Sequence, residues 1–247
     1  MRVAALYDIH GNFPALEAAL EDIHREGADR IVVGGDVLPG PMPGETIGCL
    51  LSLDIPVEFI YGNGEVAVLE QLAGRESAKV PEVYRPAIRW NAEQIRTEHG
   101  DAVARWPMTH RVDVPGMGRV LFCHATPRNE DECFTSLTPE ERLLPIFDGL
   151  NADVVVCGHT HMQFDRMVGR TRVVNAGSVG MPFGEPGADW LLLGPDVQLR
   201  HTAYDLEGAA ARIRASAYPW PEDFATRYIL KPPSAAEMLD VFTRASI

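Results

Sequence analysis

Polar residues that commonly bind metal ions follow five apolar runs of the sequence, each at the point where the run ends. These polar groups are Asp8-Ile9-His10, Gly34-Gly35-Asp36, Tyr61-Gly62-Asn63, His124, and Gly158-His159-Thr160-His161. Carboxylate, imidazole and amide-oxygen groups together suit Mn, Fe, Co, Ni or Zn. The D-x-H and H-x-H spacings place alternate side chains on the same side of an extended segment. Each residue alone has a simpler explanation, as a turn former, a helix cap or a structural histidine. Because that explanation must hold independently at five places, we favour a metal site.

The apolar runs are predicted to be strands that bring these polar residues to one edge of a sheet. Short apolar runs lie at residues 2–7, 30–33 and 57–60, and helical periodicity lies between them at 13–27 and 45–53. Such strand–helix alternation favours a parallel sheet with right-handed crossovers. Ligands of these sheets bind beyond the carboxyl ends of the strands. We therefore expect the polar residues to converge on one crevice.

The remaining sequence predicts a second set of strands and further helices. Residues 74–107 are polar, with a helix predicted at about 86–99, and we interpret them as a helical insertion covering one edge of the sheet. A hairpin is predicted at 112–122, turning at residues 115–118. Later elements are a helix at about 139–150, strands at 153–157, 164–168, 171–175, 189–194 and 197–203, and a helical tail at about 205–247. We predict one α/β domain over residues 1–247, with two packed mixed sheets flanked by helices.

Charge and hydropathy restrict the partners. The chain has 247 residues and a net charge of -13, from 22 basic and 35 acidic residues. This balance argues against tight nonspecific binding to nucleic acid but leaves a small phosphorylated substrate open, because bound metal ions can hold an anion. No apolar run approaches the roughly 20 residues needed to span a bilayer. Asp8 and His10 interrupt the first hydrophobic stretch, so we expect no signal peptide, no membrane partner and a cytoplasmic location.

The cysteines do not form a ligand motif. Cys49, Cys123, Cys133 and Cys157 include no C-x-x-C pair. Cys123 and Cys157 lie inside apolar runs, where we expect buried small hydrophobic side chains. The proposed ligands include no thiolate, which argues against a structural zinc site of the cysteine type.

The ordered series D-x-H, G-D, G-N, H and G-H-x-H resembles the calcineurin-like metallophosphoesterase superfamily, in particular its small bacterial and archaeal phosphoesterases. The resemblance covers about residues 3 to 180. It implies a four-layer αββα sandwich and two divalent transition-metal ions, with Mn expected first and Fe, Zn, Ni or Co as alternatives. It also implies three ligand sets: Asp8, His10 and His161 for the first ion, Asn63, His124 and His159 for the second, and Asp36 as the bridging, catalytic ligand.

The implied reaction is hydrolysis of a phosphomonoester or phosphodiester by in-line attack of a hydroxide that bridges the two metals. The sequence departs from the family at Gly64-Glu65, where many members have a histidine that helps to protonate the leaving group. Losing a general acid typically costs roughly 10²–10⁴-fold in rate. The loss matters least for aryl phosphates and phosphoanhydrides, so a preference for activated or diester substrates is our hypothesis. Glu65 either reaches inward or caps a helix, and we favour the cap.

Three residues are candidates for substrate binding: Asn12, Asn63 and Arg128. Arg128 either clamps a phosphate oxygen or is a solvated loop arginine. Asn12 either donates to phosphate or forms a turn. The residues Asn175-Ala176-Gly177-Ser178 resemble the family's late N-x-G-S turn, which we expect to support the metal-site histidines.

Aromatic residues in and near the insertion have two interpretations. They either wall a pocket for a base or aryl group or pack the insertion against the sheet, and packing is favoured. The residues concerned are Tyr61, Tyr84, Trp90 and Trp106.

Several activities fit the same ligand series. A phosphomonoesterase, a phosphodiesterase, a dinucleoside polyphosphate hydrolase and a protein phosphatase all remain open. A catalytically weak metal-binding scaffold is a further alternative. Scaffold members of the superfamily tend to lose ligands, and all seven ligand positions are filled here. We therefore favour an enzyme.

Overall fold

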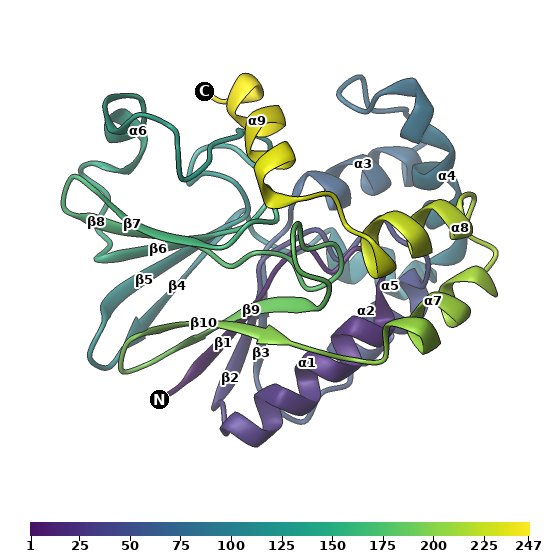
Figure 1. Ribbon diagram of the computed structural model, residues 1–247, viewed down its shortest axis with the longest axis horizontal. Helices are drawn as coiled ribbons and strands as arrows, with labels where there is room; N and C mark the ends of the chain where they lie inside the picture. Colours follow the sequence, from purple (N-terminus) through teal and green to yellow (C-terminus); the bar gives the residue numbers. More distant parts are fainter.

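Two mixed β-sheets of five strands each are packed face to face, and helices cover their outer faces (Figure 1). The structure is a computed structural model that describes residues 1–247. The four layers are therefore helix, sheet, sheet and helix. This arrangement confirms the predicted α/β class and the αββα sandwich. That residues 1–247 form a single domain stays a prediction.

The first sheet has the strand order β10-β9-β1-β2-β3. Its parallel strands are β1 (Val3–Leu6), β2 (Arg30–Val33) and β3 (Val57–Phe59). They are joined by α1 (Phe13–Glu26) and α2 (Pro43–Leu51). The antiparallel strands β9 (Ala188–Leu193) and β10 (Val197–Thr202) complete the sheet. The three parallel strands therefore end at one edge, as predicted.

The second sheet has the order β4-β5-β6-β8-β7. Its central strands β5 (Gly118–Cys123), β6 (Val154–Cys157) and β8 (Thr171–Asn175) are parallel. The edge strands β4 (Thr109–Val114) and β7 (Phe164–Val168) run antiparallel to their neighbours, and β4 with β5 forms the predicted hairpin. Helix α6 (Glu140–Phe147) packs on the outer face through Leu143 and Phe147.

Alternation along the strands explains why the sheets stack. In β1 and the residue after it, Val3, Ala5 and Tyr7 pack in the core between the two sheets, whereas Ala4 and Leu6 pack in the core beneath the helices. Successive side chains of a strand point to opposite faces. Because both faces of β1 are covered, its sequence is apolar throughout rather than alternating.

Residues 63–103 contain three short helices and a 3₁₀ turn, so the single helix predicted at 86–99 is wrong. The segment contains α3 (Asn63–Leu72), η1 (Glu82–Tyr84), α4 (Arg85–Gln94) and α5 (Thr97–Val103). The break occurs at Ile95, whose backbone is extended and whose side chain is buried in the core under the helices. Beyond α5, Trp106 stacks on Phe59 of the edge strand β3, with ring centroids 4.7 Å apart.

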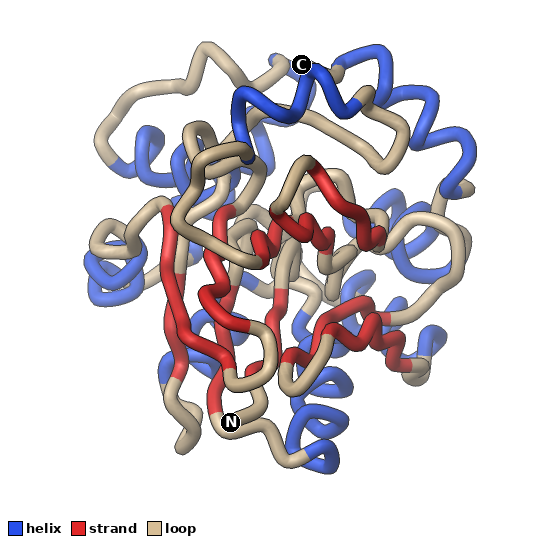
Figure 2. Tube along the Cα trace, turned by 90° about the vertical axis from the view of Figure 1, so that its left-hand side faces the viewer, coloured by secondary structure: helices blue, strands red, loops and turns tan.

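The C-terminal residues form α7 (Leu206–Arg214), α8 (Pro221–Phe224), the π-helical turn η2 (Ala225–Leu230) and α9 (Ala235–Ala245). Helices α7, α8 and η2 share a small apolar core of their own, which includes Phe224 and Ile229. Figure 2 shows α9 at the end of the molecule opposite the N-terminus. None of the helices combines the length and the apolar character that a membrane crossing requires.

Candidate metal centre

The structure brings the predicted ligands together at the ends of β1, β2, β5 and β6 and at the start of α3. Asp8, His10 and His161 form one group and Asp36, His124 and His159 a second, with the ligating atoms of each group within 4.8 Å of one another. The two groups adjoin. His10 Nε2 lies 3.7 Å from Asp36 Oδ2, and His124 Nε2 lies 3.8 Å from Asp8 Oδ1. Asn63 borders the same hollow as His10 and Asp36.

The backbone at these residues has an uncommon conformation. The chain has five non-glycine residues with positive φ: Asp8 (51°), His10 (48°), Asp36 (51°), His159 (67°) and His161 (57°). Such left-handed conformations cost of order 1–3 kcal/mol each and persist only where the surrounding structure imposes them. Backbone hydrogen bonds hold two of them, from Asp8 N to Gly35 O (3.1 Å) and from His10 N to Asp36 O (2.9 Å), and the N–H groups of Asp36 and His159 donate to carboxylates. All five strained residues are predicted metal ligands, which makes this region the candidate functional site.

Glycines around the centre leave space for the ligands. A Cβ at Gly62 would lie 2.3 Å from Asp36 Oδ1, and a Cβ at Gly158 would lie 2.5 Å from Asp8 Oδ2. At Gly64 a Cβ would lie 2.0 Å from the carbonyl oxygen of Leu38. The histidine that the family resemblance led us to look for at position 64 therefore has no room in this backbone.

Three of the four histidines are oriented by backbone carbonyls. The Nδ1 atoms of His10, His124 and His161 lie 3.2, 2.9 and 2.9 Å from the carbonyl oxygens of Pro39, Gly34 and Met181. A carbonyl oxygen only accepts, so each Nδ1 carries the proton. This tautomer leaves the Nε2 lone pair to face the centre, as a ligating imidazole requires.

The two carboxylates are fixed in a similar way. Asp8 Oδ2 accepts a hydrogen bond from His159 N (2.8 Å), and Asp36 Oδ1 accepts one from Gly64 N (2.7 Å). Asp8 Oδ1 and Asp36 Oδ2 are thus the oxygens that face the histidines. Each aspartate thereby offers one oxygen to the centre.

The electrostatics of the centre favour a cation. Burial opposes charge on His124, but the Asp36 and Asp8 carboxylates outweigh that effect and raise its pKa to about 10. Burial and the charge of His124 lower the pKa of His159 to about 4, which keeps that imidazole neutral. The two carboxylates therefore favour a positive charge beside them, which a divalent ion would supply.

Buried polar atoms without a hydrogen-bond partner also favour a bound cation at this centre. Five buried side-chain atoms have no hydrogen-bond partner, and three of them are Asp8 Oδ1, Asn63 Oδ1 and His124 Nε2. A buried polar group left without a partner costs about 1–3 kcal/mol. All three atoms belong to predicted ligands and would be satisfied by coordination. The residues present therefore fit a metal centre.

The turn after β8 supports the ligand loops. Asn175 Nδ2 donates to the carbonyl oxygen of Gly158 (2.7 Å) and to Thr160 Oγ1 (3.1 Å). Ser178 Oγ donates to the carbonyl oxygen of Asp8 (2.7 Å). The turn thereby joins the Asp8 loop to the Gly158–His161 loop, which is the supporting role predicted for it.

Glu65 caps α3, as we favoured, and it also reaches inward to the Asp36 loop. Its fully buried carboxylate accepts hydrogen bonds from the backbone N–H groups of Gly62 (2.7 Å), Asp36 (2.8 Å) and Leu38 (3.0 Å). Burial and the Asp36 carboxylate raise the pKa of Glu65 to about 7, while the hydrogen bonds from Gly62 and Leu38 favour its ionised form. The side chain thus joins the start of α3 to the Asp36 loop.

The geometry favours structural roles for two of the three substrate-binding candidates. Asn12 is buried; its Oδ1 accepts from Ala15 N (3.3 Å) to cap α1, and its Nδ2 donates to Gly180 O (2.9 Å). Arg128 is half exposed and forms an ion pair with Glu132 (2.9 Å). Substrate contact by Asn12, Asn63 or Arg128 stays a prediction.

Two residues at the centre were not anticipated. Cys133 Sγ lies 3.4 Å from His159 Nε2. Phe183 stacks on the His161 ring, with centroids 5.2 Å apart and the planes at 17°. Neither residue belongs to a recognisable motif, so only the fold reveals that they lie beside the ligands.

Two hollows open beside the centre. One of about 310 Å³ is lined by His10, Asp36 and Asn63 together with polar residues such as Lys79. The other, of about 230 Å³, is lined mainly by hydrophobic residues and also reaches His10. Of the aromatic residues considered from the sequence, Tyr84 lines both hollows. Trp106 packs on Phe59, and Trp90 packs on Tyr218.

Comparison with known proteins agrees with this geometry. A family model described as the calcineurin-like phosphoesterase superfamily domain matches residues 1–194. An uncharacterized protein of Methanocaldococcus jannaschii is 30% identical over 165 residues, which are 66% of this chain and 63% of that protein. The match thus spans less than two thirds of that relative's length.

Two solved structures have a similar fold. A hypothetical protein from Pyrococcus horikoshii has a TM-score of 0.78 at 21% identity, over 94% of this chain and 99% of that one. A metallophosphoesterase from Sphaerobacter thermophilus has a TM-score of 0.71 at 25% identity, over 92% of this chain and 98% of that one. The similarity to both structures extends beyond residue 194.

Proposed function

This chain belongs to the calcineurin-like phosphoesterase superfamily, and we propose that it is a metal-dependent phosphoesterase with a dinuclear centre. The observation that carries the proposal is the clustering of backbone strain. All five non-glycine residues with positive φ are predicted ligands, and they come from segments as far apart in sequence as Asp8 and His161. Strain of this kind collects where function requires a particular geometry.

We assign Asp8, His10 and His161 to one divalent ion and Asn63, His124 and His159 to the other. Asp36 is the proposed bridge, because its Oδ2 lies 3.7 Å from His10 Nε2 and 3.5 Å from His124 Nε2. The mixed oxygen and imidazole donors suit Mn first, with Fe, Zn, Ni or Co as alternatives.

When bound, two such ions lower the pKa of a water molecule and neutralise phosphate oxygens. The protein's own contribution is to hold the ligands in place. Carbonyl oxygens fix three imidazoles, and backbone N–H groups fix both carboxylates. Cys133 does not compete as a nucleophile. Burial and Asp131 raise the pKa of its thiol to about 11, and the thiolate is the reactive form.

The substrate is proposed to be a small phosphoester with a good leaving group, such as an aryl ester or a diester. Gly64 has no side chain and no room for one, and Glu65 is occupied with three backbone N–H groups. Neither position therefore supplies a general acid. Esters whose leaving groups need little protonation depend least on that acid.

The test is metal-dependent turnover. Metal-stripped protein would be assayed on p-nitrophenyl phosphate and on its bis ester, with and without Mn, and with Asp36→Asn as the inactive control. We expect Mn to restore hydrolysis and aryl esters to react faster than alkyl esters. Equal rates on aryl and alkyl esters would contradict the leaving-group argument. Bound Mn without hydrolysis of any ester would favour a scaffold.

A further inference from the structure

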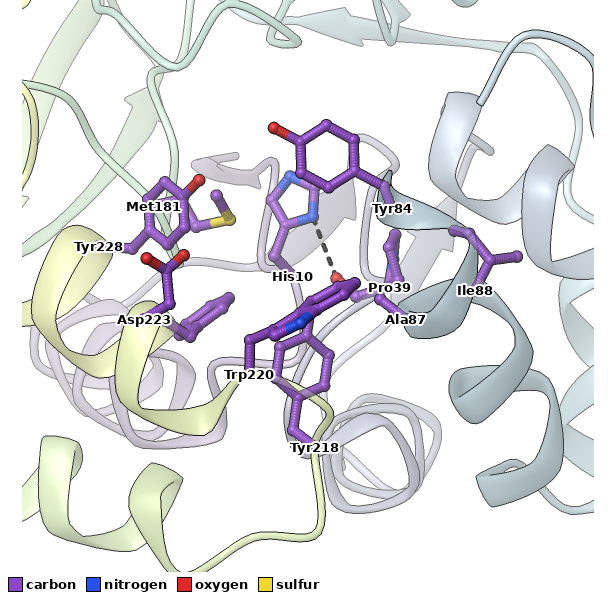
Figure 3. A pocket seen from close by; sticks show the side chains of 11 residues that line it. His10, Pro39, Tyr84, Ala87, Ile88, Met181, Tyr218, Trp220, Asp223 and Tyr228 are labelled. Atoms are coloured by element: carbon purple, nitrogen blue, oxygen red, sulfur yellow. Dashed lines mark hydrogen bonds between the residues drawn. The ribbon is translucent and has the colours of Figure 1, made fainter. Parts of the chain in front are cut away.

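The hydrophobic hollow beside His10 is walled by aromatic side chains. Eight of its eleven lining residues are hydrophobic, and five lining residues are Tyr84, Tyr218, Trp220, Phe224 and Tyr228. Figure 3 shows Tyr84 on one side of the hollow and Trp220 and Tyr218 on the opposite side, with His10 between them in this view. The hollow therefore presents ring faces and edges from two separate segments of the chain.

The hollow is continuous with the first ligand group. His10 lines it directly. Two other lining residues, Pro39 and Met181, supply the carbonyl oxygens that orient His10 and His161. A group held in the hollow would thus lie against the residues that position the first metal ion.

Four of the five aromatic lining residues come from outside the region that the family model matches. Tyr218, Trp220, Phe224 and Tyr228 all follow residue 194. They hold one another in place: Tyr218 contacts Trp220 and Phe224 edge-on at 6.2 and 5.8 Å between centroids, and Phe224 lies 5.3 Å from Tyr228. Phe224 is only 4% exposed. The walls are therefore packed together rather than loosely attached.

Size and charge indicate the occupant. A volume of about 230 Å³ is below the 300–1,000 Å³ typical of sites for drug-sized molecules, so the hollow suits a single ring system. Aromatic side chains favour stacked and edge-to-face contacts with another ring. The carboxylate in the lining, Asp223, is 53% exposed and lies 3.7 Å from Arg227, so its charge is partly balanced. Because that carboxylate already has a partner, the ring walls are the main binding surface, and they suit a planar aromatic group.

We propose that this hollow binds a planar aromatic substituent of the phosphoester, an aryl ring or a nucleobase, while the phosphate lies at the metal centre. The inference rests on the proposed function and names the substrate class. The polar hollow of about 310 Å³, which shares His10, Pro39 and Tyr84 with the aromatic one, leaves room for the second arm of a diester.

The experiment compares ligands that share a phosphate-like group and differ in the substituent. Calorimetry on the Mn-loaded full chain would measure the Kd of methylphosphonate, phenylphosphonate, adenosine 5′-monophosphate and phosphocholine, the last two as methylenephosphonate analogues that the enzyme cannot hydrolyse. We expect at least one of the two ring ligands to bind about tenfold more tightly than methylphosphonate, the scale of one stacking contact. Their order distinguishes an aryl site from a nucleobase site. That ligand should also quench the fluorescence of Trp220, a readout independent of turnover.

Matched variants locate the effect. Trp220→Leu should remove the advantage of the ring ligand, whereas Trp106→Leu should keep it, because Trp106 packs on Phe59 and lines neither hollow. Tyr84 is 56% exposed, so Tyr84→Ala should fold even if Trp220→Leu does not, and Val83→Ala is its control. Tyr84→Ala should weaken the ring ligand about tenfold relative to methylphosphonate.

The outcomes separate this inference from the proposed function. Equal binding of all ligands, tighter binding of phosphocholine than of both ring ligands, or a ring advantage that survives Tyr84→Ala and Trp220→Leu would overturn the inference alone. Failure of all four ligands to bind Mn-loaded protein would overturn the proposed function, and the inference with it.

Discussion

Two regions of the molecule contribute to neighbouring sites by different means. One is the set of loops that carry the proposed ligands, and the other is the C-terminal segment from Tyr204 to Ile247. The loops contain every non-glycine residue of positive φ, and their polar groups are held by backbone hydrogen bonds. The C-terminal segment contains no such residue and contributes aromatic rings that pack on one another. Chemistry here depends on backbone conformation, whereas substrate preference is proposed to depend on side-chain packing.

The strongest test of this difference is to remove one proposed metal-binding side chain. Asp36→Asn should lower kcat/KM by about 10³-fold or more on every ester, because a preorganised charge that holds the centre is lost. Trp220→Leu should lower kcat/KM only for esters with an aromatic substituent. Steady-state kinetics on aryl and alkyl esters would compare the two variants. A uniform loss in Trp220→Leu would mean that the C-terminal segment takes part in the chemistry itself.

Glycines in the ligand loops should tolerate substitution by alanine less well than glycines elsewhere in the chain. Gly64→Ala would place a Cβ 2.0 Å from Leu38 O, so we expect a destabilisation of about 1–3 kcal/mol or more. Gly44→Ala is the control, because its Cβ would meet nothing closer than 3.8 Å in a helix that alanine favours. Denaturant unfolding would measure both. Equal stability of the two variants would show that the loop relaxes freely.

A substitution of Glu65 distinguishes a helix-capping role of this side chain from a catalytic role. Glu65→Gln replaces one acceptor oxygen with a donor that faces backbone N–H groups, so the free energy of unfolding should fall by about 1–3 kcal/mol. The shape of the pH–rate profile of the remaining folded enzyme should not change. Loss of one limb of that profile with full stability would instead identify Glu65 as a general acid.

The smallest effects are expected at the two candidates with structural partners. Asn12→Ala should cost about 1 kcal/mol of stability through loss of the α1 cap. Arg128→Ala should change KM by less than about twofold, because its guanidinium is paired with Glu132 and lines neither hollow. Thermal unfolding and KM would be measured for both variants. A tenfold rise in KM in either variant would restore that residue as a phosphate-binding group.

The sequence predicted the parts of the site that depend on local patterns. The strand at residues 30–33 and the helix at residues 13–27, which ends at its C-cap Gly27, were placed correctly, because apolar runs and turn glycines are local signals. The break at Ile95 was missed, because burial of that side chain in a distant core overrides helical periodicity. Phe183 beside His161, and Trp220 opposite Tyr84 across the hollow, were not foreseen. Both depend on segments that meet only after the chain has folded.

Diffraction from crystals of Mn-loaded protein, measured at a wavelength where Mn scatters anomalously, tests the central claim most directly. The account predicts two anomalous peaks, one bounded by Asp8, His10 and His161 and the other by Asn63, His124 and His159, with Asp36 in contact with both. A single peak, a peak elsewhere, or correctly folded protein that takes up no metal would contradict it.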